Sequence, residues 1–217
     1  MNLLKKIAAL GCALTLFGCA STQSLDPSTD LHQGYYTGKI GRQANLGSFK
    51  VRVPQPLRDE PPEVMRLNLE TGSDYTQFNA GPTFLNPSMF TARVELKSSP
   101  NTSYQLQSLL NQQARSVKIL LKKKVTVNGH PASYTVFASP QQEDTSTDGN
   151  VTNVHITPAL TDGVYLVDYG KYNVIFWITA GADLYSSKAA NTALQNQMIN
   201  GTWGPEVAFV NSFKLYQ

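Results

Sequence analysis

The chain has 217 residues, of which 41% are hydrophobic and 15% are charged, and its formal net charge is +3. These values fit one globular domain of ordinary size. Two of the 18 basic residues, Lys5 and Lys6, lie in an N-terminal segment with the features of an export signal, and without them the balance of 16 basic and 15 acidic residues is +1. So small an excess of positive charge argues against a nucleic-acid-binding protein, because phosphate backbones are bound through many Lys and Arg contacts.

The N-terminus combines a positive start with the apolar stretch 7–17 and then Gly18 and Cys19, which is the pattern of an export signal. The apolar stretch is too short to cross a bilayer, since crossing takes about 20 apolar residues. Its ending, Leu16-Phe17-Gly18-Cys19, resembles the lipobox of bacterial lipoproteins, although Phe17 stands where a small residue is usual. The resemblance implies cleavage before Cys19 and attachment of a diacylglycerol and an N-acyl chain to Cys19, which anchors a protein stably in a membrane. The alternative is an ordinary secretory signal.

Ala20 follows the cysteine where retention in the inner membrane usually has Asp, so the resemblance implies the periplasmic face of the outer membrane. Cleavage removes Cys12 and leaves 199 residues, that is 217 minus 18, whose only thiol carries lipid. The sequence therefore predicts a fold without disulfides, cysteine catalysis or cysteine-bound metal. We expect a signal peptide over 1–18, a lipidated N-terminus and polar tether over 19–33, and one α+β domain over 34–217.

Three short runs alternate between apolar and polar residues, which is typical of strands with one buried face. They cover residues 48–53, 65–70 and 92–96. Strands of a parallel sheet, covered on both faces, are instead apolar throughout, so the alternation favours an antiparallel sheet.

Two hairpins are predicted. Asn128-Gly129 supplies the positive φ angles of a type I′ turn between strands over 124–127 and 132–137. Gly170-Lys171 separates strands over 164–169 and 172–179. The last of these strands is apolar on both faces, so we expect it at the centre of the sheet.

Helices are expected over 104–121 and 187–199, where apolar residues recur at steps of three and four and, in the second case, Gly201 follows the end. The fold class that results is an antiparallel sheet covered by one or two helices. The segment 205–216 fits both a strand and a helix, and the sequence leaves it open.

Three segments are predicted to be loops. Residues 54–63 are rich in proline and residues 139–153 are polar and acidic, so both are expected to be exposed and mobile. Residues 75–90 are rich in Gly, Pro and Asn and carry several aromatic side chains.

The sequence contains none of the common motifs of serine hydrolases, zinc proteases, P-loop proteins or dinucleotide-binding proteins. His32, His130 and His155 do not have the spacing of metal ligands. The acidic group of Glu143, Asp144 and Asp148 lacks the turn glycine and terminal glutamate of a calcium loop. We therefore expect no metal, no cofactor and no enzymatic activity. A hydrolase built on His130 or His155 with a nearby carboxylate is the least favoured hypothesis.

Two groups of residues are candidates for binding. Lys122, Lys123 and Lys124, with Lys118 before them, either complete the end of a helix, where cations are favourable, or form a basic patch for anionic headgroups or an acidic partner. Phe84, Met89 and Phe90, in the third predicted loop, are either core residues or anchors for a protein partner.

The order of these elements, with Val207-Ala208-Phe209-Val210-Asn211-Ser212-Phe213 near the end, resembles the layout of PsbP-like proteins and of DcrB-type bacterial lipoproteins. The resemblance implies a small antiparallel sheet covered by helices and an accessory or binding role. The leading hypothesis is an outer-membrane lipoprotein that binds another envelope protein. The alternative is a carrier or sensor of an apolar small molecule or lipid held between sheet and helix.

Overall fold

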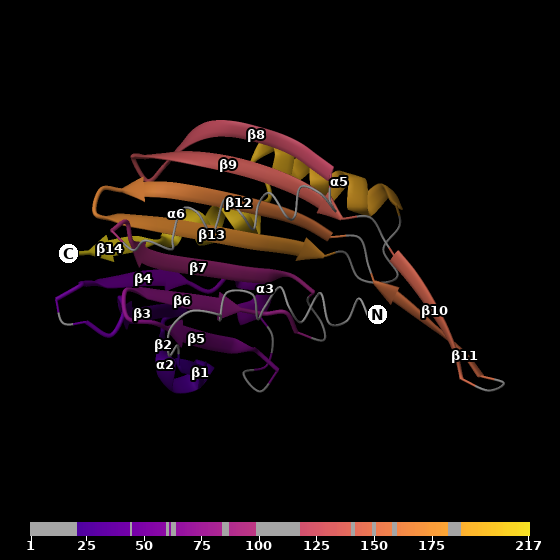
Figure 1. Ribbon diagram of the computed structural model, residues 1–217, viewed down its shortest axis with the longest axis horizontal. Coiled ribbons are helices and arrows are strands. Elements are labelled where there is room, and N and C mark those ends of the chain that lie inside the picture. The colour runs from indigo at the N-terminus through magenta and orange to yellow at the C-terminus, as the bar shows by residue number, and fades with distance from the viewer. Residues whose placement is uncertain are drawn as a thin grey trace.

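An eight-stranded antiparallel sheet dominates the part of the chain that the computed structural model describes, namely residues 21–43, 45–59, 61, 64–83, 87–98, 118–139, 142–148, 151–157, 160–181 and 188–217. Its strands lie in the order β1 (Ser21–Leu25), β5 (Leu67–Thr71), β6 (Tyr75–Ala80), β7 (Met89–Leu96), β13 (Tyr172–Gly181), β12 (Leu160–Tyr169), β9 (His130–Ser139) and β8 (Lys118–Val127). Strands β1 and β8 are therefore the two edges of this large sheet (Figure 1).

A smaller antiparallel sheet and two longer helices pack on one face of the large sheet. The small sheet has the order β14 (Lys214–Tyr216), β4 (Ser48–Arg52), β3 (Tyr35–Lys39) and β2 (Leu31–His32). The helices are α5 (Lys188–Asn200) and α6 (Gly204–Ser212), and two single-turn helices, α2 (Pro27–Asp30) and α3 (Gln55–Arg58), lie in the connections.

Two further strands, β10 (Gln142–Asp148) and β11 (Val151–Thr157), pair only with each other among the described strands. They leave the large sheet after β9, return to it at β12, and project beyond the ends of its strands (Figure 1). We call this hairpin the arm.

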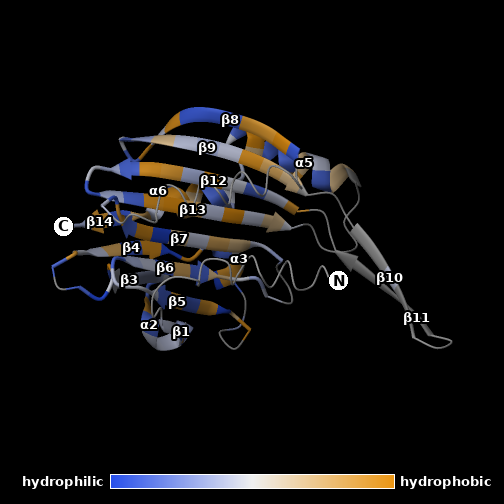
Figure 2. Cartoon of the chain, viewed as in Figure 1, coloured by the Kyte–Doolittle hydropathy of each residue, from blue (hydrophilic) through white to orange (hydrophobic). Residues whose placement is uncertain are grey.

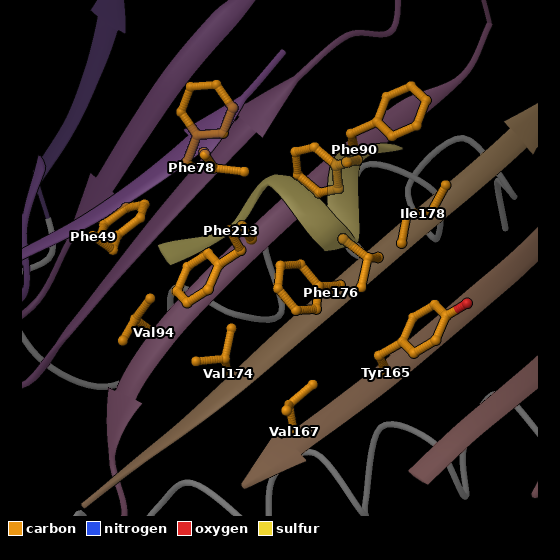
Figure 3. Packing of buried hydrophobic residues seen from close by; sticks show 14 of the residues in the cluster. Phe49, Phe78, Phe90, Val94, Tyr165, Val167, Val174, Phe176, Ile178 and Phe213 are labelled. Carbon is orange, nitrogen blue, oxygen red and sulfur yellow. The ribbon is translucent and has the colours of Figure 1, made fainter. Parts of the chain in front are cut away.

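The core lies between the large sheet and the layer formed by α6 and the small sheet (Figure 3). Aromatic rings join the two layers: the centroid of Phe213 lies 5.3 Å from that of Phe176 on β13 and 5.9 Å from that of Phe49 on β4. Aromatic pairs at such distances add to the free energy gained by burying their area. The packing explains why α6 can be held in place although it spans only nine residues.

The three alternating runs are confirmed as β4, β5 and β7, and both hairpins form as predicted, β8 with β9 and β12 with β13. Asn128 and Gly129 have φ angles of 50° and 82°, as a type I′ turn requires. Strand β13 lies between β7 and β12, inside the large sheet, which confirms its predicted central position.

The helix expected over 187–199 is confirmed as α5, and Gly201, with φ of 67°, follows its end. Of the helix expected over 104–121, residues 104–117 lie outside the described residues, and the prediction is wrong for Lys118–Leu121, which belong to β8. Lys118, Ile119 and Leu121 pair with β9, with a register irregularity at Leu120 between them, and that pairing outweighs a local pattern that fits a helix as well. The segment left open, 205–216, contains both structures: α6 and then β14.

Four predictions of irregular structure are wrong. Residues 54–63, expected to be exposed, contain α3 and the fully buried Leu57. Ser21–Leu25, in the expected tether, pairs with β5, residues 139–153 contain β10 and the start of β11, and residues 75–90 contain β6 and the start of β7. Backbone hydrogen bonds form whatever the side chains are, so polar edge strands escape a search for apolar alternation. The protein is thus a sheet-dominated domain, richer in strand than the predicted α+β layout, and its regular structure begins before residue 34.

Candidate functional site

The basic run lies on β8, at the free edge of the large sheet. Residues Leu121–Val127 form a continuous stretch of this strand between the register irregularity after Ile119 and the turn at Asn128. We call this stretch the lysine edge, because it contains the three consecutive lysines 122–124, which form a hydrophilic part of β8 in Figure 2. In the described part of the chain no strand pairs with its outer side.

The lysines of this edge point in different directions. The side chains of Lys122 and Lys124 are exposed, whereas Nζ of half-buried Lys123 lies 3.4 Å from the carbonyl oxygen of Ile199, on the side of α5. The helix-end interpretation of the run is wrong because all three lysines lie within a strand. Lys122 and Lys124 are exposed, as the alternative interpretation requires, and the binding role of the basic patch stays a prediction.

The aromatic candidates do not form a surface. Phe90 is fully buried, and its ring centroid lies 5.7 Å from that of Trp203 and 5.4 Å from that of Phe209. Met89 is half-buried at the start of β7, and Phe84 lies outside the described residues. The anchor role predicted for Phe90 is therefore wrong, and this residue belongs to the core.

Cys19 lies outside the described residues. In the sequence it precedes Ser21, the first residue of β1, by two positions. Seven interstrand steps of about 4.8 Å separate β1 from β8, which amounts to roughly 34 Å. The lysine edge is thus at the opposite edge of the large sheet from β1, the strand that follows Cys19 in the sequence.

A buried polar cluster lies on the face of the large sheet that is opposite to α6. Side chains alternate along β7, so Arg93 and Glu95 point away from the core that Val94 enters. Nε of Arg93 lies 2.8 Å from Oε2 of Glu95, and the two side chains are only 11% and 3% exposed. The guanidinium group also lies 3.7 Å from the ring centroid of Tyr75, whose hydroxyl donates a 2.5 Å hydrogen bond to Glu70. Burial raises the pKa of Glu95, and the charge of Arg93 opposes the rise.

Three atoms of this cluster are buried and have no hydrogen-bond partner among the residues that the structure describes: Nη1 of Arg93, Oε1 of Glu95 and Oε1 of Gln77. Each such atom costs about 1–3 kcal/mol of stability. The sequence could not identify the cluster, because in an alternating strand Arg93 and Glu95 are expected on the solvent side, and their burial depends on residues distant in the sequence.

A second buried acid, Glu206, lies in the first turn of α6 and is fully inaccessible to solvent. The hydroxyl oxygen of Tyr134 lies 2.8 Å both from Oε1 of Glu206 and from the carbonyl oxygen of Met198. Since a hydroxyl group has one proton, it can donate to only one of these acceptors. A protonated Glu206 removes the conflict, because it donates to Tyr134 while Tyr134 donates to Met198. Burial raises the pKa of Glu206 to about 7, and nearby Tyr134, Tyr165 and Lys123 oppose the rise.

The three histidines lie on three different strands, β2, β9 and β11. His130 stacks on Tyr169 with ring centroids 3.9 Å apart, His32 is exposed on β2, and His155 lies on β11. Within the ranges that the structure describes, no three His, Cys, Asp or Glu residues are grouped so that they could hold a metal ion. The described helices include none that is both long and apolar enough to span a bilayer.

Fold and site together define a sheet-dominated protein with a basic edge and a projecting arm. No protein-family model and no curated protein matches its sequence. Two solved structures are similar to it. The solution structure of cyanobacterial PsbP (CyanoP) from Synechocystis sp. PCC 6803 has a TM-score of 0.35 and 10% identity, covering 93% of this chain and 96% of that one. The crystal structure of the Ran-binding protein Mog1p from Saccharomyces cerevisiae has a TM-score of 0.34 and 11% identity, covering 82% and 95%.

Proposed function

We propose that the protein is a lipoprotein of the outer membrane, anchored on the periplasmic side through Cys19, and that it acts as a non-catalytic binding module of an envelope assembly. The observation that carries the proposal is the lysine edge. Its inner side pairs with β9, its outer side pairs with no strand in the described part of the chain, and its Lys122 and Lys124 are exposed. It lies at the opposite edge of the large sheet from β1, the strand that follows Cys19 in the sequence. An open edge strand is a template for pairing with another chain, and its charges select the partner.

The export signal and the cysteine at its end support the anchored location, and the nearness of β1 to Cys19 supports a domain held close to the membrane. The carrier alternative lacks comparable support. Between the large sheet and α6, the rings of Phe90, Phe176, Phe209 and Phe213 contact one another in the space where an apolar ligand would have to lie.

The proposal is tested by crosslinking the lipidated protein in mild-detergent extracts and identifying what is captured. We expect a defined envelope protein with the wild type and its loss with the double variant Lys122→Glu, Lys124→Glu. The matched control is Lys39→Glu with Lys214→Glu, which reverses two exposed lysines on the small sheet and should retain the partner. Capture that is undiminished by the variant Lys122→Glu, Lys124→Glu would refute the role of the lysine edge. A Cys19→Ala form that still carries lipid in a palmitate-labelling experiment would refute the anchor.

A further inference from the structure

The arm is an incomplete sheet. Two-stranded hairpins are at best marginally stable in water and usually need a third strand or a packing partner. Both outer edges of the arm are unpaired among the described strands, and the arm projects away from the large sheet (Figure 1). Its backbone therefore offers hydrogen-bond donors and acceptors to another strand.

The charges of the arm are opposite to those of the lysine edge. Strand β10 carries Glu143, Asp144 and Asp148 and no basic residue, whereas the lysine edge carries three lysines and no acidic residue. The other strand of the arm, β11, has no acidic residue, so β10 is the complementary edge. The lengths also match: β10 has seven residues, as many as the lysine edge Leu121–Val127.

We propose that β10 of one copy pairs with the lysine edge of a second copy of this chain, adding a ninth strand to the large sheet. The inference rests on the proposed function, whose docking surface it uses, and it names the first partner of that surface. Lysines on an edge strand commonly prevent two sheets from joining. Here they repel the β8 strand of another copy and attract β10, so that one set of charges both excludes one pairing and favours the other.

The contact joins two different surfaces, so each copy can use its arm and its lysine edge at the same time. Such head-to-tail contacts produce rings or open chains of subunits. Pairing of a chain's own β10 with its own β8 would instead close the contact within one copy and would be independent of concentration. The dependence of association on concentration therefore separates the two arrangements.

The experiment uses the full lipidated protein in density-matched detergent and measures its mass by sedimentation equilibrium from about 1 to 100 μM. The arm variant is Glu143→Lys, Asp144→Lys, Asp148→Lys, and the edge variant is Lys122→Glu, Lys124→Glu. The wild type should self-associate. The association constant of each variant alone should be lower by a factor of about ten or more, because like charges then oppose each other. An equimolar mixture should associate again, since each arm then meets an edge of opposite charge. Circular dichroism of both variants checks that they are folded.

A wild type that stays monomeric at 100 μM, or a mixture that associates no better than its components, would overturn the inference. If edge lysines are nevertheless needed to capture another envelope protein, the proposed function stands without the inference. Self-association that weakens in each variant and returns in their mixture, with no other protein captured, would support the inference and refute the accessory role.

Discussion

Glu206 is expected to make the stability of the protein depend on pH between about 4.5 and 7. The carboxyl group is fully buried, and its pKa rises from an ordinary 4.5 to about 7 in the folded state. Below about pH 4.5 both the folded and the unfolded chain hold the proton, so the group contributes no pH dependence. As the pH rises toward 7 the unfolded chain releases the proton first, and the free energy of unfolding falls. Above pH 7 Glu206 is ionised in both states, and it lowers the free energy of unfolding no further.

The size of this loss follows from the two pKa values. One unit of pKa corresponds to about 1.4 kcal/mol, so the displacement from 4.5 to about 7 amounts to about 3 kcal/mol. Glu206→Gln should remove this pH dependence, because the amide donates to Tyr134 as the protonated acid does and never ionises. The variant should match the wild type near pH 4.5 and exceed it by about 3 kcal/mol at pH 8.

The assay is urea unfolding at several pH values from 4.5 to 8, followed by tryptophan fluorescence. The difference between variant and wild type isolates Glu206, because all other titrating groups contribute to both. Asp168→Asn is the control: a hydrogen bond from Lys97 lowers the pKa of Asp168, so this exposed carboxylate is ionised throughout the range. If the free energies of unfolding of the wild type and of Glu206→Gln depend on pH in the same way, the reasoning is refuted. Glu206 would then have the same pKa in the folded and unfolded chains.

Two further substitutions test the packing. Gly163→Ala should destabilise the protein by about 1–3 kcal/mol in chemical denaturation, because the added Cβ atom would lie 2.7 Å from Oε1 of Glu206 and 3.0 Å from Cε of Met198. Gly204→Ala, with no atom within 4 Å of the added carbon, is its control, and equal effects of the two would contradict the close packing. Phe90→Ala should cost about 3–5 kcal/mol of stability, as a fully buried ring does. An unchanged midpoint of unfolding would instead mean that Phe90 does not contribute to the core and would favour the surface role that the sequence suggested.

Patterns local to one strand were predictable from the sequence. The alternation in β4, β5 and β7 and the turn residues Asn128 and Gly129 each depend on neighbours in the chain, and they gave the correct structure. The local pattern of Lys118–Leu121 predicted the wrong structure, because a strand and a helix can bury the same apolar residues and pairing with β9 decides between them. Strands β1 and β10 were missed because their side chains are mostly polar and only backbone pairing defines them.

The same distinction between local patterns and distant contacts applies to the candidate site. That Lys122 and Lys124 are exposed followed from their charge, whereas their position on a free edge follows from the order of eight strands, which no local pattern encodes. The burial of Arg93 and Glu206 was not predictable either. Each lies where neighbouring residues suggest solvent, and segments distant in the sequence bury it.

These buried polar groups set the conditions under which the fold is most stable. The unpartnered atoms of Arg93 and Glu95 oppose folding at neutral pH, and ionised Glu206 adds to their cost. The aromatic core must offset both, because the mature chain that the sequence predicts has no second cysteine with which to form a disulfide. Protonation of Glu206, and of Glu95, whose pKa is also raised by burial, relieves part of the cost. Mildly acidic conditions should therefore stabilise this protein relative to pH 8, whereas an acid stabilised as an ion pair would give the opposite dependence.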